Sequence, residues 1–349
     1  MLPRKILVLQ TAFLGDVVLT LPLVQLLHRR FPNADIDFVA TPKGAEVLRH
    51  HPAIHSIIEY DKRGSERGLR GIFSLASKLK QVRYEVALVP HRSLRSALIV
   101  ALSRIPLRVG FDTSMGSIFF TKRITYKKAS HEIERNLTLL KVFGIDHREK
   151  EYPSLYPSQQ DASAVDTFLA ENGVHANDTI VAIAPGSVWN TKRWLPERFG
   201  EVVRKLRSAG LKVILVGGKE DATLCADIAG SSEKKEVIVA AGSFTILQSA
   251  ELLRRCAAIV TNDTAPMHLA VAMRTPVVAL FGPTVPAFGF APYGERDVVL
   301  QTEGLPCRPC SIHGGDRCPI GTFDCMKRID AKLVFEKTME TKQFPRTRT

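Results

Sequence analysis

The segment from Ala184 to Trp194, APGSVWNTKRW, combines groups that bind a phosphate or diphosphate. The apolar run Ile180–Ala184 predicts a buried strand, and the Pro-Gly pair after it turns the chain at its carboxyl end. Backbone N–H groups from Gly186 onward, the Ser187 hydroxyl and the Lys192 ammonium would then face an anion. The alternative is an ordinary loop with solvated basic side chains, and this segment alone does not separate the two.

Two further segments follow predicted strands in the same half of the chain. In Gly217–Glu220 the glycines permit a close backbone approach, and the Glu220 carboxylate could accept hydrogen bonds from a ribose diol. The second segment is Thr261–Ala270, TNDTAPMHLA. Its candidate ligand-binding residues are Asp263, Thr264 and His268. Taken singly, Asp263 could be only a helix cap and His268 only a buried, hydrogen-bonded residue. Because the carboxyl ends of parallel strands lie at one edge of a sheet, a common ligand-binding site is favoured.

The conspicuous acid of the first half is Asp16, which follows the apolar strand Arg4–Gln10 and a short loop. A carboxylate at that strand end could act as a general base on a hydroxyl that attacks an anomeric carbon. The alternative is that Asp16 only caps the predicted helix Val17–Phe31.

Strands and helical patterns alternate along the whole chain, which predicts parallel sheets with helices on both faces. The other predicted strands are 34–40, 54–60, 84–90, 211–216, 236–240, 258–261 and 276–281. The predicted helices between them are 44–50, 71–82, one after Pro90, 130–143 capped by Ser130, 161–172, 196–208, 221–229, 246–256 and 265–273. Residues 144–160 have no apolar period and predict a linker, which gives two domains, 1–155 and 156–349, the second ending in a basic tail, KQFPRTRT.

The positive charge of the chain, +13 in total, is concentrated in its first half. Residues 1–155 hold 25 Lys and Arg against 14 Asp and Glu, whereas residues 156–349 hold 23 against 21. Such a surplus attracts polyanions, although a solubilising surface is the alternative. His91, Arg92 and Arg95 are predicted in the first turn of a helix, where cations oppose the helix dipole, so an anionic ligand there is one explanation and a solvated face the other.

Several protein classes are disfavoured by what the sequence lacks. It contains neither GxGxxG after the first strand nor GxxxxGK[ST], which argues against a nicotinamide-binding domain, a nucleotide-sugar epimerase and a P-loop NTPase. Only 7% of residues are aromatic and no nucleic-acid-binding module is recognisable. No apolar run approaches a membrane-spanning length, and the N-terminus resembles a strand rather than a signal peptide, which predicts a cytoplasmic protein. We also expect a monomer.

Four of the six cysteines, Cys307, Cys310, Cys318 and Cys325, fall within one segment. The first two form a CxxC, and the later gaps of seven and six residues could close a tetrahedral zinc site. A second tight CxxC is missing, so reduced thiols in a loop are the favoured interpretation and no metal is predicted.

Four segments in this order resemble the ADP-heptose:lipopolysaccharide heptosyltransferases. They are AFLGDVVLTLP, APGSVWNTKRWLPERF, VGGKED and NDTAPMHLAVAMRTPVVALFGPT, and the similarity runs from Ile6 to about Asp330. The segments HRSLRSALI and CRPCSIHGGDRCPIGTFDCM are most similar to heptosyltransferase II. The resemblance implies a GT-B fold, in which two Rossmann-like parallel-sheet domains face a central cleft.

The resemblance also implies an inverting transfer of L-glycero-D-manno-heptose from ADP-heptose to the lipopolysaccharide inner core, without cofactor or metal. Asp16 matches the family's catalytic base, and the donor-binding positions are Gly186, Ser187, Lys192, Glu220, Asp263, Thr264 and His268. The implied acceptor is Kdo-lipid A or heptosyl-Kdo-lipid A at the inner face of the inner membrane. Arg92 and Arg95 are its candidate contacts, and attraction to that anionic surface fits the basic first half. Heptosyltransferase I, or another nucleotide-sugar glycosyltransferase of this fold, is the alternative.

Overall fold

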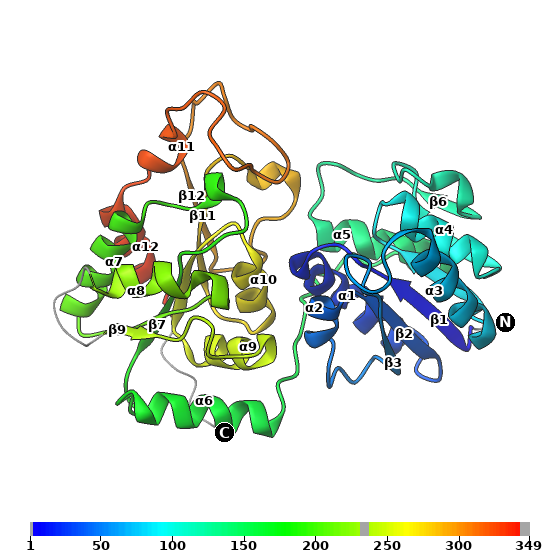
Figure 1. The fold of residues 1–349 in the computed structure, drawn as a ribbon, viewed down its shortest axis with the longest axis horizontal. Coiled ribbons are helices and arrows are strands. Elements are labelled where there is room, and N and C mark those ends of the chain that lie inside the picture. The colour runs from blue at the N-terminus through cyan, green and yellow to red at the C-terminus, as the bar shows by residue number, and fades with distance from the viewer. Residues whose placement is uncertain (1–2, 231–236, 343–349) are drawn as a thin grey trace. The chain divides into compact units, whose positions relative to one another are not determined.

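The computed structural model describes residues 3–230 and 237–342, and the chain separates into two compact units, Met1–Tyr156 and Pro157–Thr349 (Figure 1). The division lies one residue beyond the domain boundary expected from the sequence. Each unit contains one six-stranded sheet with helices packed on it. The predicted basic tail lies outside the described residues, apart from Lys342, as does Glu236 at the start of a predicted strand.

The sheet of the first unit is entirely parallel, in the order β3-β2-β1-β4-β5-β6. Its strands are β1 (Lys5–Leu9), β2 (Asp35–Ala40), β3 (Ser56–Glu59), β4 (Val86–Val89), β5 (Leu107–Phe111) and β6 (Lys122–Ile124). The chain winds outward from β1 to β3, then returns to the other side of β1 with β4. The loops after β1 and β4 therefore diverge at a topological switch point, where open α/β sheets bind ligands.

The helices of the first unit bury one apolar face against this sheet. They are α1 (Leu14–Arg30), α2 (Pro42–Glu46), α3 (Gly68–Val82), α4 (Leu94–Leu102) and α5 (Glu132–Leu137), with 3-10 turns η1 (Ser117–Phe119) and η2 (Thr138–Phe143). In α3 the buried residues Ile72, Leu75, Ala76 and Leu79 recur at helical spacing, which is why the sequence predicts this helix well.

The second unit repeats the same topology, in the order β12-β11-β10-β7-β8-β9, again with every strand pair parallel. Its strands are β7 (Ile180–Ala184), β8 (Lys212–Leu215), β9 (Val237–Val239), β10 (Ala258–Asn262), β11 (Val277–Phe281) and β12 (Val298–Gln301). Here the switch point lies between β7 and β10. Every residue of β7, β10 and β11 is buried, as expected for central parallel strands covered on both faces.

The helices of the second unit are α6 (Gln159–Glu171), α7 (Pro196–Ser208), α8 (Ala222–Gly230), α9 (Ile246–Arg255), α10 (Ala265–Ala272), α11 (Asp324–Lys327) and α12 (Ala331–Thr341), with 3-10 turns η3 (Asn190–Lys192), η4 (Lys219–Asp221) and η5 (Pro286–Phe288). Trp194 and Phe199 meet edge to face in the core, with ring centroids 5.0 Å apart. The Trp194 indole N–H donates to the Met326 carbonyl at 3.2 Å, which satisfies its one polar group.

Three helix starts predicted from the sequence are wrong. The N-cap of α1 is Phe13, and Asp16 lies in the first turn, where its carboxylate accepts the Phe13 N–H at 3.0 Å. The N-cap of α5 is His131 rather than Ser130. Likewise Ser93 caps α4, so His91 and Arg92 precede that helix and only Arg95 lies in its first turn. In each case a nearby side chain competes for the same orphan N–H groups.

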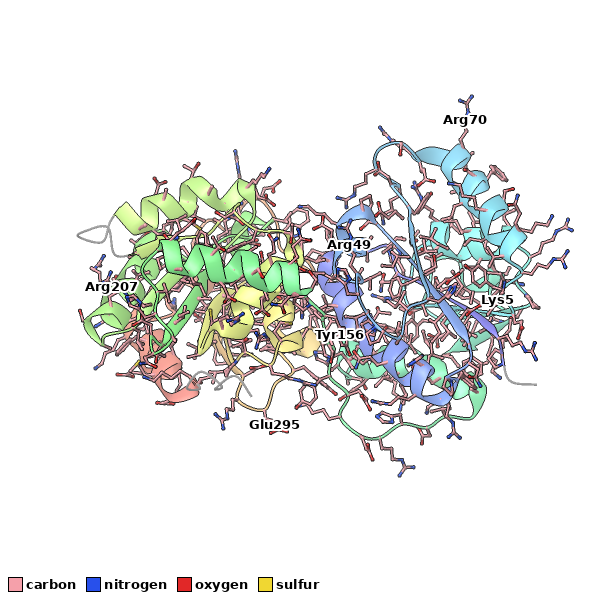
Figure 2. The ribbon with its side chains drawn as sticks, turned by 90° about the horizontal axis from the view of Figure 1, so that it is seen from below. Lys5, Arg49, Arg70, Tyr156, Arg207 and Glu295 are labelled. Carbon is pink, nitrogen blue, oxygen red and sulfur yellow. The ribbon has the colours of Figure 1, made fainter. Side chains whose placement is uncertain are left out.

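None of the helices in the described ranges is long and apolar enough to cross a membrane. The side chains drawn in Figure 2 include Arg70, which extends from α3 of the first unit and is exposed. Part of the surplus of Lys and Arg in the first half therefore lies on ordinary solvated surface.

Candidate functional site

The candidate donor-binding loops all leave the second sheet at its carboxyl edge. Strand β7 lies between β8 and β10, with Ile183 opposite Leu215 and Ala184 opposite Thr261. The loops that follow these three neighbouring strands therefore emerge side by side. This confirms the convergence expected from the sequence.

Lys192 and Asp263 form an ion pair at this switch point. The Lys192 Nζ lies 2.6 Å from Asp263 Oδ2 and donates to the Asp263 carbonyl at 3.2 Å. Thr284, which the sequence analysis did not select, donates its hydroxyl to the same carboxylate oxygen at 2.7 Å. Only 13% of the Lys192 side chain and 9% of that of Asp263 are exposed. Asp263 therefore holds the Lys192 ammonium in place and is not the N-cap of a helix.

Asn262 joins two of the loops and was also missed. Its side-chain amide donates to the Pro185 carbonyl at 2.8 Å, and its side-chain oxygen accepts the Trp194 N–H at 3.1 Å. Asn262 is completely buried. The last residue of β10 therefore holds both ends of the loop that carries Lys192. A buried polar residue at the end of an apolar strand is the signal that could have identified it.

We expect Asn262→Ala to destabilise the second unit by roughly 2–3 kcal/mol, because two buried main-chain groups lose their partner. Urea unfolding followed by tryptophan fluorescence would measure the loss, since both hydrogen bonds end near Trp194. The control is Asn172→Ala, which removes an exposed amide that bonds only to the nearby Phe168 carbonyl. Equal stability of the two variants would contradict this role for Asn262.

Gly186 is required by a close approach of Asp221, a residue the sequence analysis placed only in a helix. A Cβ at Gly186 would lie 2.1 Å from Asp221 Oδ1, while Asp221 Oδ2 accepts the Gly218 N–H at 3.0 Å. Ser187 is buried, and its hydroxyl accepts the Trp189 N–H at 3.2 Å. Glu220 is exposed at the end of the β8 loop. These contacts shape a tight turn in the loop that follows β7.

The remaining two donor candidates lie at the start of α10. Thr264 is the N-cap residue, and its hydroxyl donates to the Asn262 carbonyl at 3.3 Å rather than to the helix. His268 is buried one turn into the helix. The amino end of α10 thus lies beside Asp263, where the helix dipole favours an anion.

In the first unit, Asp16 lies at the corresponding switch point between β1 and β4. The loops after these strands are linked by Thr11 and His91, whose hydroxyl oxygen and Nδ1 are 3.1 Å apart. Burial lowers the pKa of His91 to about 4, helped by the nearby charges of Lys62 and Arg92, so its imidazole is neutral.

Asp16 has the electrostatic character of a general base. Burial and the nearby Glu132 carboxylate raise its pKa to about 7, whereas the Phe13 N–H and Arg92 act in the opposite direction. A base with a pKa near neutrality is about half ionised at neutral pH and is strong enough to accept a proton from a reacting hydroxyl.

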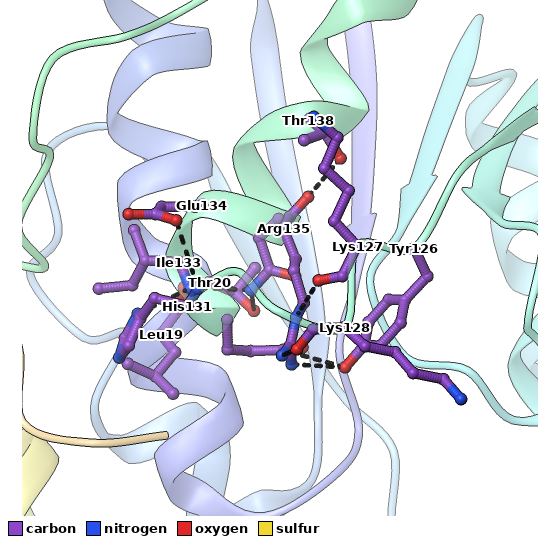
Figure 3. Close-up of polar contacts among 12 residues, drawn as sticks. Leu19, Thr20, Tyr126, Lys127, Lys128, His131, Ile133, Glu134, Arg135 and Thr138 are labelled. Atoms are coloured by element: carbon purple, nitrogen blue, oxygen red, sulfur yellow. Dashed lines mark hydrogen bonds and ion pairs between the residues drawn. The ribbon is translucent and has the colours of Figure 1, made fainter. Parts of the chain in front are cut away.

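Glu132 on α5 belongs to a buried polar cluster with Tyr126 and Arg135, which are labelled in Figure 3. Its Oε2 accepts Arg135 NH1 at 2.8 Å and the Tyr126 hydroxyl at 3.1 Å. Arg135 also donates to the Tyr126 oxygen at 2.7 Å, and Asn136 ties α5 to α1 through the Leu19 carbonyl at 3.1 Å. A charged residue with its hydrogen-bonding partners on every side is rigid, so this cluster holds a carboxylate at a fixed position near Asp16.

Two cations, Arg92 and Lys62, lie near enough to interact with Asp16, and Lys62 was not predicted. Arg92 stacks on Tyr126, with its guanidinium carbon 4.1 Å from the ring centroid, and its charge acts on Asp16 and Glu132. Arg95 donates to the Lys62 carbonyl at 3.2 Å. Burial lowers the pKa of Lys62, as do Arg63 and Arg95, while Asp16 raises it. The Lys62-Arg63 pair in the polar segment after β3 is the signal in the sequence that could have identified Lys62.

Comparisons with known proteins agree with this arrangement. Residues 72–315 match the model of glycosyltransferase family 9, the heptosyltransferases. Lipopolysaccharide heptosyltransferase 2 of Salmonella typhimurium is 28% identical over 293 residues, which cover 81% of this chain and 84% of that protein. Lipopolysaccharide heptosyltransferase 1 of Pseudomonas aeruginosa is 27% identical over 319 residues, covering 88% and 86%.

A solved structure of a family 9 glycosyltransferase from Veillonella parvula superposes with a TM-score of 0.87 at 24% identity and covers 97% of each chain. The two six-stranded parallel sheets with flanking helices form a GT-B-like α/β fold. The chain belongs to glycosyltransferase family 9, the heptosyltransferases.

Proposed function

We propose that this enzyme transfers L-glycero-D-manno-heptose from ADP-heptose to the inner core of lipopolysaccharide with inversion at the anomeric carbon. The observation that carries the proposal is Asp16, a carboxylate with a pKa of about 7 that lies near Arg92 and Lys62 at the switch point of the first sheet. The second sheet supplies the complementary feature, an ammonium held in a tight backbone turn.

In this mechanism Asp16 removes the proton from the acceptor hydroxyl as the hydroxyl oxygen attacks C1 of the heptose. The bond between C1 and the diphosphate breaks, and ADP leaves with the negative charge. Lys192, the backbone turn at Gly186 and the amino end of α10 stabilise that charge, while Glu220 binds the ribose. Ser187, Thr264 and His268 complete the donor site.

We further propose that the acceptor is heptosyl-Kdo-lipid A, so that the enzyme adds the second heptose at the inner face of the inner membrane. The phosphates and carboxylates of such an acceptor suit Arg92, Arg95 and Lys62, which are already held together by hydrogen bonds and stacking. The segments HRSLRSALI and CRPCSIHGGDRCPIGTFDCM support the second-heptose assignment, since they resemble heptosyltransferase II.

The acceptor can be identified by measuring ADP release from ADP-heptose in the presence of Kdo-lipid A or of heptosyl-Kdo-lipid A. We expect release with the acceptor that already carries one heptose and little with the other. The reverse preference would assign the enzyme to the first heptose instead, and release independent of either acceptor would contradict the proposed transfer.

Activity is expected to rise with pH through a midpoint of about 7, because Asp16 must be ionised to accept a proton. Glu132→Gln removes a negative charge that raises the pKa of Asp16, so the midpoint should move to lower pH. Burial continues to raise the pKa, so the midpoint should stay above 3.8. The measurement is the pH dependence of kcat for both proteins.

The matched control is Glu134→Gln, which changes an exposed carboxylate two residues further along α5. It should keep the wild-type midpoint. Because Glu132 is buried against Arg135, circular dichroism should confirm that the variant folds. A folded Glu132→Gln enzyme with an unshifted profile would show that Glu132 does not act on the base.

A further inference from the structure

The cysteine-rich segment between β12 and α11 is not explained by the transfer reaction. Residues 302–323 contain neither a helix nor a strand, and two of their apolar side chains face solvent, with Ile312 57% and Ile320 58% exposed. Arg308 ties the first part of this stretch to the Gly282 and Thr284 carbonyls, whereas the part that follows Cys310 needs another source of order.

Four thiols of this segment and α11 lie close together. Cys325 is buried at the start of α11, and the thiols of Cys307, Cys310 and Cys318 are all near enough to act on it electrostatically. A cavity of about 80 Å³ is lined by three of the four, Cys310, Cys318 and Cys325. That volume exceeds what a single water or ion requires.

Backbone N–H groups of residues 320–323 lie around the sulfur of Cys318. Converging backbone N–H groups form a concave anion site, and a thiolate is the form of cysteine that binds metal.

We propose that Cys307, Cys310, Cys318 and Cys325 form a tetrahedral thiolate site for a thiophilic transition-metal ion, with zinc as the expected ion. Four thiolates match the preferred ligands and coordination number of structural zinc sites. The proposal departs from the expectation from sequence that the segment holds no metal, and it needs no assumption about the reaction.

The sulfurs are spread more widely than a bound ion would hold them, so the loop must tighten on binding. In the described part of the chain, the group whose ligand atoms all lie within 4.8 Å of one another is His147, Glu149 and Glu151. There Arg29 already forms an ion pair with Glu151 and would compete with a cation. Arg308 also acts on Cys310 and Cys325, but four soft thiolates are better ligands for zinc than one imidazole and two carboxylates, which makes the cysteine cluster the better site.

A metal ion at this site would also restrain the loop after β7 that carries Lys192. Gly315, between the second and third cysteines, accepts the Thr191 N–H at 3.0 Å and donates its own N–H to the Thr191 hydroxyl at 2.8 Å. Thr191 directly precedes Lys192. Because metal binding is coupled to ordering of the peptide that supplies the ligands, ion loss should loosen this attachment.

Metal analysis of the full-length protein, purified reduced and without chelator, tests the site. We expect about one zinc or iron per chain in the wild type. Cys310→Ser and Cys318→Ser should lose most of it, whereas Cys256→Ser, which changes a buried cysteine in α9's C-cap, should keep it. Metal removal should also speed trypsin cleavage after the exposed Arg317.

If the serine variants do not fold, cobalt titration of the metal-free wild type decides the question. A stoichiometric rise of thiolate-to-cobalt absorption would support the site. A wild type that is purified without metal and shows no such absorption would overturn the proposal, as would Cys318→Ser retaining the full metal content.

Discussion

Replacing Asp16 by Asn is expected to lower the rate of heptosyl transfer by roughly two or more orders of magnitude while leaving ADP-heptose binding nearly intact. The amide cannot accept the proton of the acceptor hydroxyl, but its oxygen can still accept the Phe13 N–H that begins α1. The fold should therefore survive the change. Steady-state ADP release gives the rate, and calorimetry with ADP-heptose gives the affinity.

The matched control for this variant is Glu85→Gln, which neutralises an exposed carboxylate just before β4, at the opposite edge of the same sheet. It should retain the wild-type rate. If the Asp16→Asn enzyme also turned over at the wild-type rate, Asp16 would have no place in the mechanism.

Lys192→Ala is expected to weaken ADP binding by roughly 10- to 100-fold and to lower kcat/KM for ADP-heptose further. The loss has two causes. The cation that faces the leaving group disappears, and the buried Asp263 carboxylate, which lies 2.6 Å from the Lys192 Nζ, is left to repel the diphosphate. Calorimetric titration with ADP would measure the change in affinity.

A second substitution separates these two causes. Adding Asp263→Ala to Lys192→Ala should recover part of the lost affinity, because the unpaired carboxylate is then gone. Lys205→Ala, on the exposed face of α7, is the control and should bind ADP as the wild type does. Undiminished affinity in Lys192→Ala would remove the residue from the donor site.

The parts of the fold that were predicted are those where periodicity dominates. The central strands of the second sheet are continuous apolar runs such as Ile180–Ala184, and the structure confirms them. Strands β5, β6 and β12 were not predicted. Charged residues such as Arg108 and Lys122 interrupt the apolar pattern of β5 and β6, and β12 is an edge strand of only four residues. The pairing with the rest of the sheet, which sequence does not display, makes these segments strands.

The candidate site could be predicted as a set of loops but not as a set of contacts. The strand-end rule and the family resemblance brought Ser187, Lys192 and Asp263 to one sheet edge. Neither could reveal that Asp263 pairs with Lys192, that Thr284 supports it, or that Asn262 staples the loop, because these contacts join residues far apart in sequence. The Glu132 cluster was missed for the same reason.

The most direct test of the central claim is the mass of the acceptor after incubation with ADP-heptose and this enzyme. We predict that heptosyl-Kdo-lipid A gains one heptose for each ADP released, and that the Asp16→Asn enzyme gives neither product at a comparable rate. ADP released while the acceptor mass stays unchanged, or an acceptor that grows equally fast without the Asp16 carboxylate, would contradict the account.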